Sequence, residues 1–300
     1  MKLTYVILEA EEIGPYIPDL SELERGIRYP IDDGKDHFTI SHGEQYTPFF
    51  ESMGKPRFMA VVDDGKTIGL TTGVWKDAVI RGKKRTALYS ADTKLRKDYR
   101  GKKIASKMLI RALWAYLRGS KYHGWDLIYF AAMVGKKGDI SRTFKKFHLG
   151  NLASPKVQFK IFFVDPPKLA QIEINNGNDG LQKFKQKVDL SPNNKGVVSN
   201  RGKKDLTFDS NGQVWDLAHI NLDLEQPILI QLKSAGEALV DKNEGALACF
   251  AIDSKMSLEL SALKKNGITT ETHCNLFTFS WPFKVNVKKG DLVNLSTAEI

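Results

Sequence analysis

Cysteine is scarce in this sequence: Cys249 and Cys274 are the only two in 300 residues. No Cys-x-x-Cys pair and no cysteine–histidine cluster has the spacing of zinc ligands. The sequence therefore predicts no metal site. We expect the two cysteines to be buried thiols in a reducing cytoplasm rather than a disulfide.

Long apolar runs are also missing. No stretch approaches the roughly 18 uninterrupted apolar residues that a membrane-spanning helix needs. The N-terminus, MKLTYVILEAEE, turns acidic after one short apolar run, which is unlike a secretory signal peptide. The sequence thus predicts a cytoplasmic protein with no membrane partner.

Charge is abundant but unevenly placed. The net charge is +10, and residues 1–165 hold 29 Lys+Arg against 19 Asp+Glu, whereas residues 166–300 hold 16 of each. The excess is densest from Arg81 to Lys107, where only Asp92 and Asp98 are acidic. Such a stretch attracts phosphorylated cofactors or other polyanions, although a solvated lysine-rich face has the same composition.

Three apolar segments with turn residues between them predict an antiparallel meander. They are Arg57–Asp63, Thr67–Ile80 and Arg85–Leu95. Asp63-Asp64-Gly65-Lys66, between the first two, has the acidic-glycine pattern of a hairpin turn. Arg81-Gly82-Lys83-Lys84 forms the next turn. Before the meander, two short helices are expected over Asp19–Arg28 and His37–Ser52.

The pattern then changes to helical spacing. Apolar residues recur three or four positions apart between Ile104 and Leu117. Asp126–Val134 is a nearly uninterrupted apolar run, as expected of a buried strand. A strand–helix–strand unit requires Arg85–Leu95 and Asp126–Val134 to lie roughly parallel. The predicted fold class is α/β, with an α+β type of mixed sheet.

The length suggests two domains. We predict a first domain over residues 1–165, a linker over 166–212 that is rich in Asn, Gly, Lys and Asp, and a smaller C-terminal α/β domain over 213–300. The order strand, helix, strand over 126–163 recurs over 246–281, at an offset of about 118 residues. Chance explains this repetition as well as duplication does.

The segment Arg100–Ser106 carries the clearest chemistry, because it opens the long helix directly after a strand. The first N–H groups of a helix have no internal partner and, with the helix dipole, favour an anion. Gly101 lets the backbone approach a ligand closely, Ala105 keeps the next turn thin, and Ser106 offers a hydroxyl. With Arg100, Lys102, Lys103 and Lys107 around it, this helix start suits a pyrophosphate.

Arg100-Gly101-Lys102-Lys103-Ile104-Ala105 resembles the CoA-binding signature of the GNAT superfamily of N-acetyltransferases. That signature is Arg or Gln, two residues, Gly, one residue, then Gly or Ala. Lys103 departs from it, because the family usually has glycine there. The resemblance covers residues 1–165 and implies a GNAT-like domain that binds acetyl-CoA through residues 100–106. The C-terminal domain would then be, as one option, a degenerate GNAT-like half.

The resemblance also implies a mechanism. The strands Arg85–Leu95 and Asp126–Val134 would splay apart, and the backbone near Thr93 and Leu95 would hold the pantetheine arm. A backbone N–H would stabilise the oxyanion of the thioester. The acceptor, a small-molecule or peptide amine, would lose its proton to a general base.

Four residues are candidates for proton transfer. The family often has a tyrosine acid where this sequence has Phe144, so the acid is replaced by Ser141, by Thr143 or by nothing. On the fourth strand, Tyr89 is either a wall of the substrate site or catalytic, and Asp92 is either a solvated charge or a base. In a regular strand Tyr89 shares a face with Leu95, and Asp92 lies on the other face unless a bulge intervenes.

The leading hypothesis is an N-acyltransferase that uses acetyl-CoA or a longer acyl-CoA. The alternative is a non-catalytic module that senses CoA or binds another polyanion. Nucleic-acid binding is a third option, but the basic stretch lacks interleaved aromatics and any recognised nucleic-acid motif. A homodimer remains possible.

Overall fold

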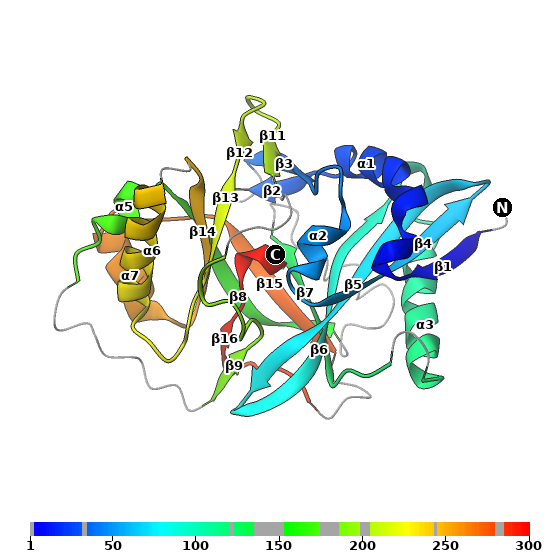
Figure 1. The fold of residues 1–300 in the computed structure, drawn as a ribbon. Coiled ribbons are helices and arrows are strands. Elements are labelled where there is room, and N and C mark those ends of the chain that lie inside the picture. The colour runs from blue at the N-terminus through cyan, green and yellow to red at the C-terminus, as the bar shows by residue number, and fades with distance from the viewer. Residues whose placement is uncertain are drawn as a thin grey trace.

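A single mixed sheet runs through the whole molecule. The computed structural model describes residues 3–31, 35–119, 123–134, 153–174, 186–198, 205–242, 245–279 and 285–300. Within these ranges a 12-stranded sheet has the order β1-β4-β5-β6-β7-β15-β8-β14-β13-β10, with β9 and β16 paired beside this path. Figure 1 shows α3 beside one end of the sheet, α5, α6 and α7 beside the other, and the C-terminal segment between them. The expected α/β class with a mixed sheet is confirmed.

The large sheet draws strands from both halves of the chain. Its strands are β1 (Thr4–Leu8), β4 (Lys55–Asp63), β5 (Lys66–Ile80), β6 (Lys83–Leu95), β7 (Leu127–Met133), β8 (Ala153–Val164), β9 (Lys187–Asp189), β10 (Gly196–Val198), β13 (Leu217–Asn221), β14 (Leu247–Asp253), β15 (His273–Phe279) and β16 (Leu292–Asn294).

Strands β4, β5 and β6 form the predicted meander, and its turns lie where the sequence indicates them. Asp63 pairs with Lys66 across the first turn, and Ile80 pairs with Lys83 across the second. The two central residues of each turn have positive φ, at 48° and 75° for Asp64-Gly65 and at 51° and 76° for residues 81 and 82. Paired positive φ angles define the type I′ turn, whose twist suits two-residue hairpins.

A smaller sheet lies over the large one, with the order β12-β11-β3-β2. Its strands are β2 (Tyr29–Ile31), β3 (Asp36–Ser41), β11 (Asp205–Phe208) and β12 (Val214–Trp215). The helix expected over His37–Ser52 is therefore wrong for its first half, and only α2 (Thr47–Glu51) is helical there. Strand β3 pairs with β11, far away in sequence, and local periodicity cannot reveal such a partner.

Helices cover the large sheet on both faces. They are α1 (Ile17–Arg25), α3 (Ile104–Leu117), α5 (Pro166–Ala170), α6 (Ile228–Lys242) and α7 (Ser257–Lys265), with 3₁₀ turns η1 (Ala10–Glu12), η2 (Gly14–Tyr16), η4 (Lys97–Tyr99) and η5 (Thr297–Glu299). In the described part of the chain, none of these helices combines the length and apolarity needed to cross a membrane.

Side chains of the large sheet alternate between its two faces, which carry three apolar clusters. One face is continuous across both halves of the chain; it includes Val74, Tyr89, Tyr129 and Phe159 and packs under α1, α2, the smaller sheet and the C-terminal segment. The opposite face is covered in two separate places. Helix α3 packs there on residues such as Leu88, whereas α6 and α7 pack around the stacked pair of Phe162 and Phe250 on the opposite side of β8 and β14. This alternation is the period of two that a pleated strand imposes.

The strands of the two repeated units, over 126–163 and 246–281, interlace at the centre of the sheet; the helix expected over 139–147 lies outside the described residues. The order there is β7-β15-β8-β14, and every neighbouring pair is antiparallel. The last strand of each unit thus lies between the first and last strands of the other. In addition, β13, α6 and β14 repeat the parallel arrangement of β6, α3 and β7. The two halves of the sheet thus repeat one arrangement of parallel strands beside a helix.

The stretch interpreted as a linker contributes to both sheets. Residues 166–212 contain α5, β9, β10 and β11, and β9 pairs with β5 and β16. The large sheet crosses both predicted boundaries without a break. The division of the chain into two domains stays a prediction.

Candidate functional site

Strands β6 and β7 form a fork. They are parallel and pair at Ala87–Leu127, at Leu88–Ile128 and finally at Tyr89–Tyr129. Along the described length of both strands the pairing ends there, although β6 continues to Leu95 and β7 to Met133. Beyond Tyr129, β7 pairs with β15 on its other side. Among the described residues, the fork therefore leaves one backbone edge of β6 without a strand partner over its last six residues.

The open end of the fork leads to the start of α3. The first helical bond of α3 is donated by Lys107 N to Lys103 O at 3.1 Å, so the N–H groups of residues 104–106 precede the helical ladder. The side chain of Lys103 makes no capping bond, and the first turn has no acidic residue. Within the described ranges, neither the capping residue nor an acidic residue of the first turn competes with an anion at this helix start.

The loop before α3 is fixed from both sides. The hydroxyl of Tyr99 donates to Asp63 Oδ2 at 2.8 Å, and Arg96 N donates to Ile68 O at 2.9 Å. Gly101 has a φ of 80°, a conformation that costs an L-residue about 1–2 kcal/mol. Lys103 also has a positive φ, of 59°. A positive φ suits glycine better than a residue with a Cβ, which explains why a glycine would be favoured at the position of Lys103.

The side chains of the predicted CoA-binding residues fall into two groups. Arg100, Lys102, Lys103 and Ala105 are exposed around the helix start, with Lys102 Nζ above the Tyr99 ring at 4.7 Å. Ile104, the first residue of α3, has a buried side chain and can offer a ligand only its backbone. The Oγ of Ser106 is buried, with no hydrogen-bond partner among the described residues.

Two residues near the end of β6 already make hydrogen bonds, one through its backbone carbonyl and one through its side chain. Arg100 Nε donates to Leu95 O at 3.2 Å, and Thr93 Oγ1 lies 2.8 Å from Thr71 Oγ1 on β5. A ligand that lies along β6 would meet the carbonyl of Leu95 already bonded on one side.

A bulge interrupts β6 at Asp92. Thr72 pairs with Ala91, but Leu70 pairs with Lys94, so β6 has one residue more than β5 between these pairs, and Asp92 has a φ of 49°. Leu95 consequently packs in the cluster under α3, on the face opposite to Tyr89. The expectation that Tyr89 and Leu95 share a face is wrong, because it assumed a regular strand. The bulge also turns Asp92 towards the face of Tyr89.

Asp92 belongs to a buried polar cluster under α1, β3 and α2. Lys94 Nζ donates to Asp92 Oδ2 at 2.7 Å and to Glu24 Oε1 at 2.6 Å. Tyr46 donates its hydroxyl to Asp92, and His42 Nδ1 bonds Glu24. The side chains of Asp92, Lys94 and Glu24 are each no more than 6% exposed.

The donor set of Glu24, His42 and Asp92 has a geometry that could ligate a cation. The ammonium of Lys94, however, lies within hydrogen-bond distance of both carboxylates and already supplies a positive charge there. A metal ion would have to displace this buried charge, so the residues do not fit one.

The charges of this cluster stabilise each other. Burial would raise the pKa of Glu24, but the hydrogen bond to His42 and the charge of Lys94 outweigh burial and hold that pKa below its usual range. Burial would likewise lower the pKa of Lys94, and the charges of Asp92 and Glu24 raise it instead.

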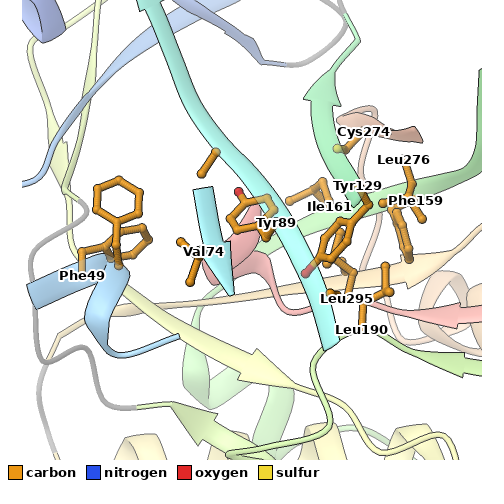
Figure 2. Close-up of a cluster of buried hydrophobic side chains, with 14 of the residues drawn as sticks. Phe49, Val74, Tyr89, Tyr129, Phe159, Ile161, Leu190, Cys274, Leu276 and Leu295 are labelled. Carbon is orange, nitrogen blue, oxygen red and sulfur yellow. The ribbon is translucent and has the colours of Figure 1, made fainter. Parts of the chain in front are cut away.

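Two stacked tyrosines lie where the fork closes. The rings of Tyr89 and Tyr129 are 5.3 Å apart at their centroids and inclined by 25°. Tyr129 donates its hydroxyl to the buried carboxylate of Glu299, which also accepts hydrogen bonds from Lys76 and Ser191. Figure 2 shows the two rings side by side within the apolar cluster.

A second fork in the C-terminal half is filled by the chain itself. Strands β13 and β14 are parallel and pair only from Leu217–Leu247 to His219–Cys249, within their described lengths. Thr297 Oγ1 donates to Cys249 O at 2.9 Å and lies 2.9 Å from His219 Nδ1. The segment around η5 thus occupies the gap that corresponds to the fork between β6 and β7.

The sequence located the fork and the loop but missed the groups around Asp92. Glu24 lies in α1, His42 and Tyr46 lie in the loop between β3 and α2, and Lys94 lies in β6, so no local pattern joins them. Ser141 lies outside the described residues.

This chain is similar to known proteins in its fold but not in its sequence. No family model and no curated protein matches the sequence. N-myristoyltransferase of Saccharomyces cerevisiae with bound myristoyl-CoA matches with a TM-score of 0.51 and 10% identity, over 92% of this chain and 78% of that chain. A structure of the same enzyme with myristoyl-CoA and inhibitors matches with a TM-score of 0.51 and 9% identity, over 92% and 80%. The expected GNAT-like fold is confirmed.

Proposed function

We propose that the protein transfers an acyl group from acyl-CoA to an amine. The observation that carries this proposal is the fork between β6 and β7, which opens towards the uncapped start of α3. An anion-binding helix start matches the phosphate end of CoA, and the edge of β6, which has no strand partner in the described part of the chain, matches the pantetheine end. The yeast structure of the same fold, which contains myristoyl-CoA, supports a thioester as the donor.

In this proposal the N–H groups of residues 104–106 bind the pyrophosphate, and Arg100, Lys102 and Lys103 add positive charge. The pantetheine arm lies along β6 between Leu95 and Ala91. A backbone N–H beside Thr93, at the bulge, donates to the thioester oxygen and stabilises the oxyanion of the tetrahedral intermediate.

Asp92 is the general base in this proposal. It accepts a proton from the acceptor amine, whose nitrogen attacks the thioester carbon; the C–S bond then breaks, and the CoA thiolate takes up the proton that Asp92 accepted. Hydrogen bonds from Tyr46 and Lys94 hold the carboxylate in place. Acetyl-CoA as donor and a small-molecule or peptide amine as acceptor are the specific substrates that we propose.

The second candidate function is a CoA-binding module without catalysis. One observation favours it: the carboxylate of Asp92 is already bonded to Lys94 and Tyr46, as in a purely structural ion pair. A measurement of turnover distinguishes the acyltransferase from the CoA-binding module.

Isothermal titration with acetyl-CoA tests binding. We expect saturable binding by the wild type and its loss in Gly101→Asp, which places a carboxylate against the phosphates. Gly82→Asp is the matched control, because Gly82 has a similar φ of 76° but lies at the turn between β5 and β6. No binding by the wild type would remove the proposal. Binding without thiol release across a panel of amines would favour the second candidate.

A further inference from the structure

We propose that the outer face of α3 binds the surface of an anionic lipid membrane. This contact goes beyond acyl transfer, because it uses the side of α3 that faces away from the sheet. Figure 1 shows α3 at the outer edge of the molecule.

Helix α3 is apolar on two opposite sides. Towards the sheet, Ile104 and Met108 pack in the cluster around Leu88. On the other side, large apolar side chains are between 37% and 59% exposed. They are Ile110, Leu113, Trp114 and Leu117. Their spacing of three, one and three residues places them on one face of the helix. A surface helix usually presents polar residues there, and a contiguous exposed apolar patch marks a site of contact.

Helix α6, which repeats the arrangement of α3 in the other half of the sheet, has the usual pattern. Its exposed residues include Glu237, Asp241 and Lys242. Its two large exposed apolar residues, Ile230 and Val240, are ten positions apart, so they form no continuous patch. The apolar outer face is therefore specific to α3.

The charge beside the outer face of α3 has one sign. Residues 99–125 include seven Lys or Arg and no Asp or Glu. Lys107, Arg111 and Arg118 are exposed, and their spacings of four and seven residues align them in a basic row along one side of the apolar face. The Cζ of Arg118 lies 5.6 Å from the centroid of the Trp114 ring, so the row adjoins the face.

This combination is complementary to anionic lipid. The apolar side chains of an interfacial helix enter the boundary between headgroups and acyl chains, and tryptophan favours the headgroup level. Basic side chains beside them attract the negative headgroups. In the described part of the chain, Lys107, Arg111 and Arg118 form no ion pair with an acidic residue, so their charge is available to lipid.

A second copy of the chain is less complementary to this face. A two-fold dimer presents the same patch from both subunits. Two basic rows would then gather in one interface, and α3 has no acidic residue to neutralise them. The like charges favour lipid over a second copy.

A helix that lies in the membrane surface needs no spanning length. Helix α3 has 14 residues, whereas roughly 20 are needed to cross a bilayer. The prediction of no membrane partner came from the lack of long apolar runs, so it concerns spanning segments and does not cover this contact.

Co-sedimentation of the full chain with lipid vesicles tests the proposal. The probes are vesicles of phosphatidylcholine alone and vesicles of equal parts of phosphatidylcholine and phosphatidylserine. We expect binding to the anionic vesicles, weakened by added salt because salt screens surface charge. Binding to phosphatidylcholine alone should be at least about ten-fold weaker.

Two double variants isolate the apolar face. Ile110→Ser with Leu117→Ser removes half of its large side chains and should weaken binding to anionic vesicles by at least about ten-fold. Ile230→Ser with Leu258→Ser is the matched control, because it removes an exposed isoleucine from α6 and an exposed leucine from α7. This control should bind as the wild type does.

Two single variants isolate the charge. Arg118→Gln should weaken binding to anionic vesicles by about five-fold. Lys242→Gln, in the last turn of α6, is its control and should leave binding unchanged. All the substituted residues are exposed, and circular dichroism should show folded protein in each case. If the α3 double variant does not fold, Arg118→Gln still decides.

The outcomes either support or overturn the proposal. Vesicle binding that falls in both α3 variants and not in their controls supports it. It is overturned if the wild type does not bind anionic vesicles, binds both kinds equally, or loses nothing in either α3 variant. A wild-type dimer that ignores vesicles and becomes a monomer in Ile110→Ser/Leu117→Ser would assign the face to a second copy instead. None of these outcomes depends on CoA, so the proposed function is tested separately.

Discussion

Lys94 donates a hydrogen bond to Asp92 at 2.7 Å across the bulge of β6, in a site from which water is almost excluded. Lys94 also neutralises Glu24. Its removal would leave two buried carboxylates without a cation, and breaking a buried ion pair typically costs about 3–5 kcal/mol. We predict that Lys94→Met lowers the free energy of unfolding by about this amount, as measured by urea denaturation.

Lys84, which is exposed on β6, offers a control for Lys94→Met. Lys84→Met should change the free energy of unfolding by less than about 0.5 kcal/mol. Equal stability of the wild type and Lys94→Met would show that the buried cluster contributes nothing to folding.

Asp92→Asn tests the proposed base. The amide can still accept the hydrogen bond of Tyr46 but cannot take a proton from the amine. General base catalysis contributes about 10²–10⁴-fold, so kcat should fall within that range while the Kd for acetyl-CoA stays unchanged. Asp77→Asn, at an exposed position of β5, is the control. Full activity of Asp92→Asn would show that Asp92 has only a structural role.

The stability of the protein should decline in acid. The pKa of Glu24 in the folded state lies below its unfolded value of about 4.3. A lowered pKa contributes stability that is fully present above the unfolded value and disappears as the pH falls through the folded value. We therefore expect the free energy of unfolding to decrease below about pH 4.3, and less steeply in Glu24→Gln. Parallel curves for the two proteins would contradict this assignment.

In alkali the dependence of stability on pH has the opposite sign, so stability falls as the pH rises. Lys94, Tyr89 and Tyr129 all have raised pKa values in the folded protein. Their contribution is complete below the unfolded values, about 10.4 for lysine and 10 for tyrosine, and is lost as the pH rises above them. Denaturation between pH 9 and 11 should show stability falling with pH, and a flat profile would be the contrary result.

Lys103→Gly should stabilise the protein. Lys103 has a φ of 59°, and left-handed backbone costs a residue with a Cβ about 1–2 kcal/mol. Glycine adds unfolded-state entropy of about 0.5–1 kcal/mol, so we predict a net gain of up to about 1 kcal/mol in thermal unfolding. Lys102→Gly is the control: Lys102 has no positive φ, and glycine should destabilise it. Loss of stability in both variants would show that the Lys103 conformation is not strained.

The sequence predicted the parts of the site that depend on local order. The meander, its turns, the helix Ile104–Leu117 and the loop before it all follow from periodicity and turn residues within about sixty positions. The fork follows from the resemblance, since the strand–helix–strand unit by itself indicates only that the two strands are parallel.

What the sequence could not give depends on contacts between distant elements. The bulge at Asp92 is invisible because Asp92, Thr93 and Lys94 have no glycine and no break in their pattern. Lys94 looks like any surface lysine until Glu24, from α1, is brought beside it. Glu299 reaches Tyr129 from the far end of the chain, and no local pattern relates the two.

The interlacing of β7, β15, β8 and β14 has a consequence for how the chain acquires its structure. Val157 on β8 pairs with Leu276 on β15, so the middle of the sheet closes only after a loop of more than one hundred residues has formed. Such long-range pairing makes folding slow. Neither half of the chain can complete the sheet without the other. A fragment ending near residue 165 would leave β7 and β8 with exposed edges, the kind of surface on which unfinished chains aggregate.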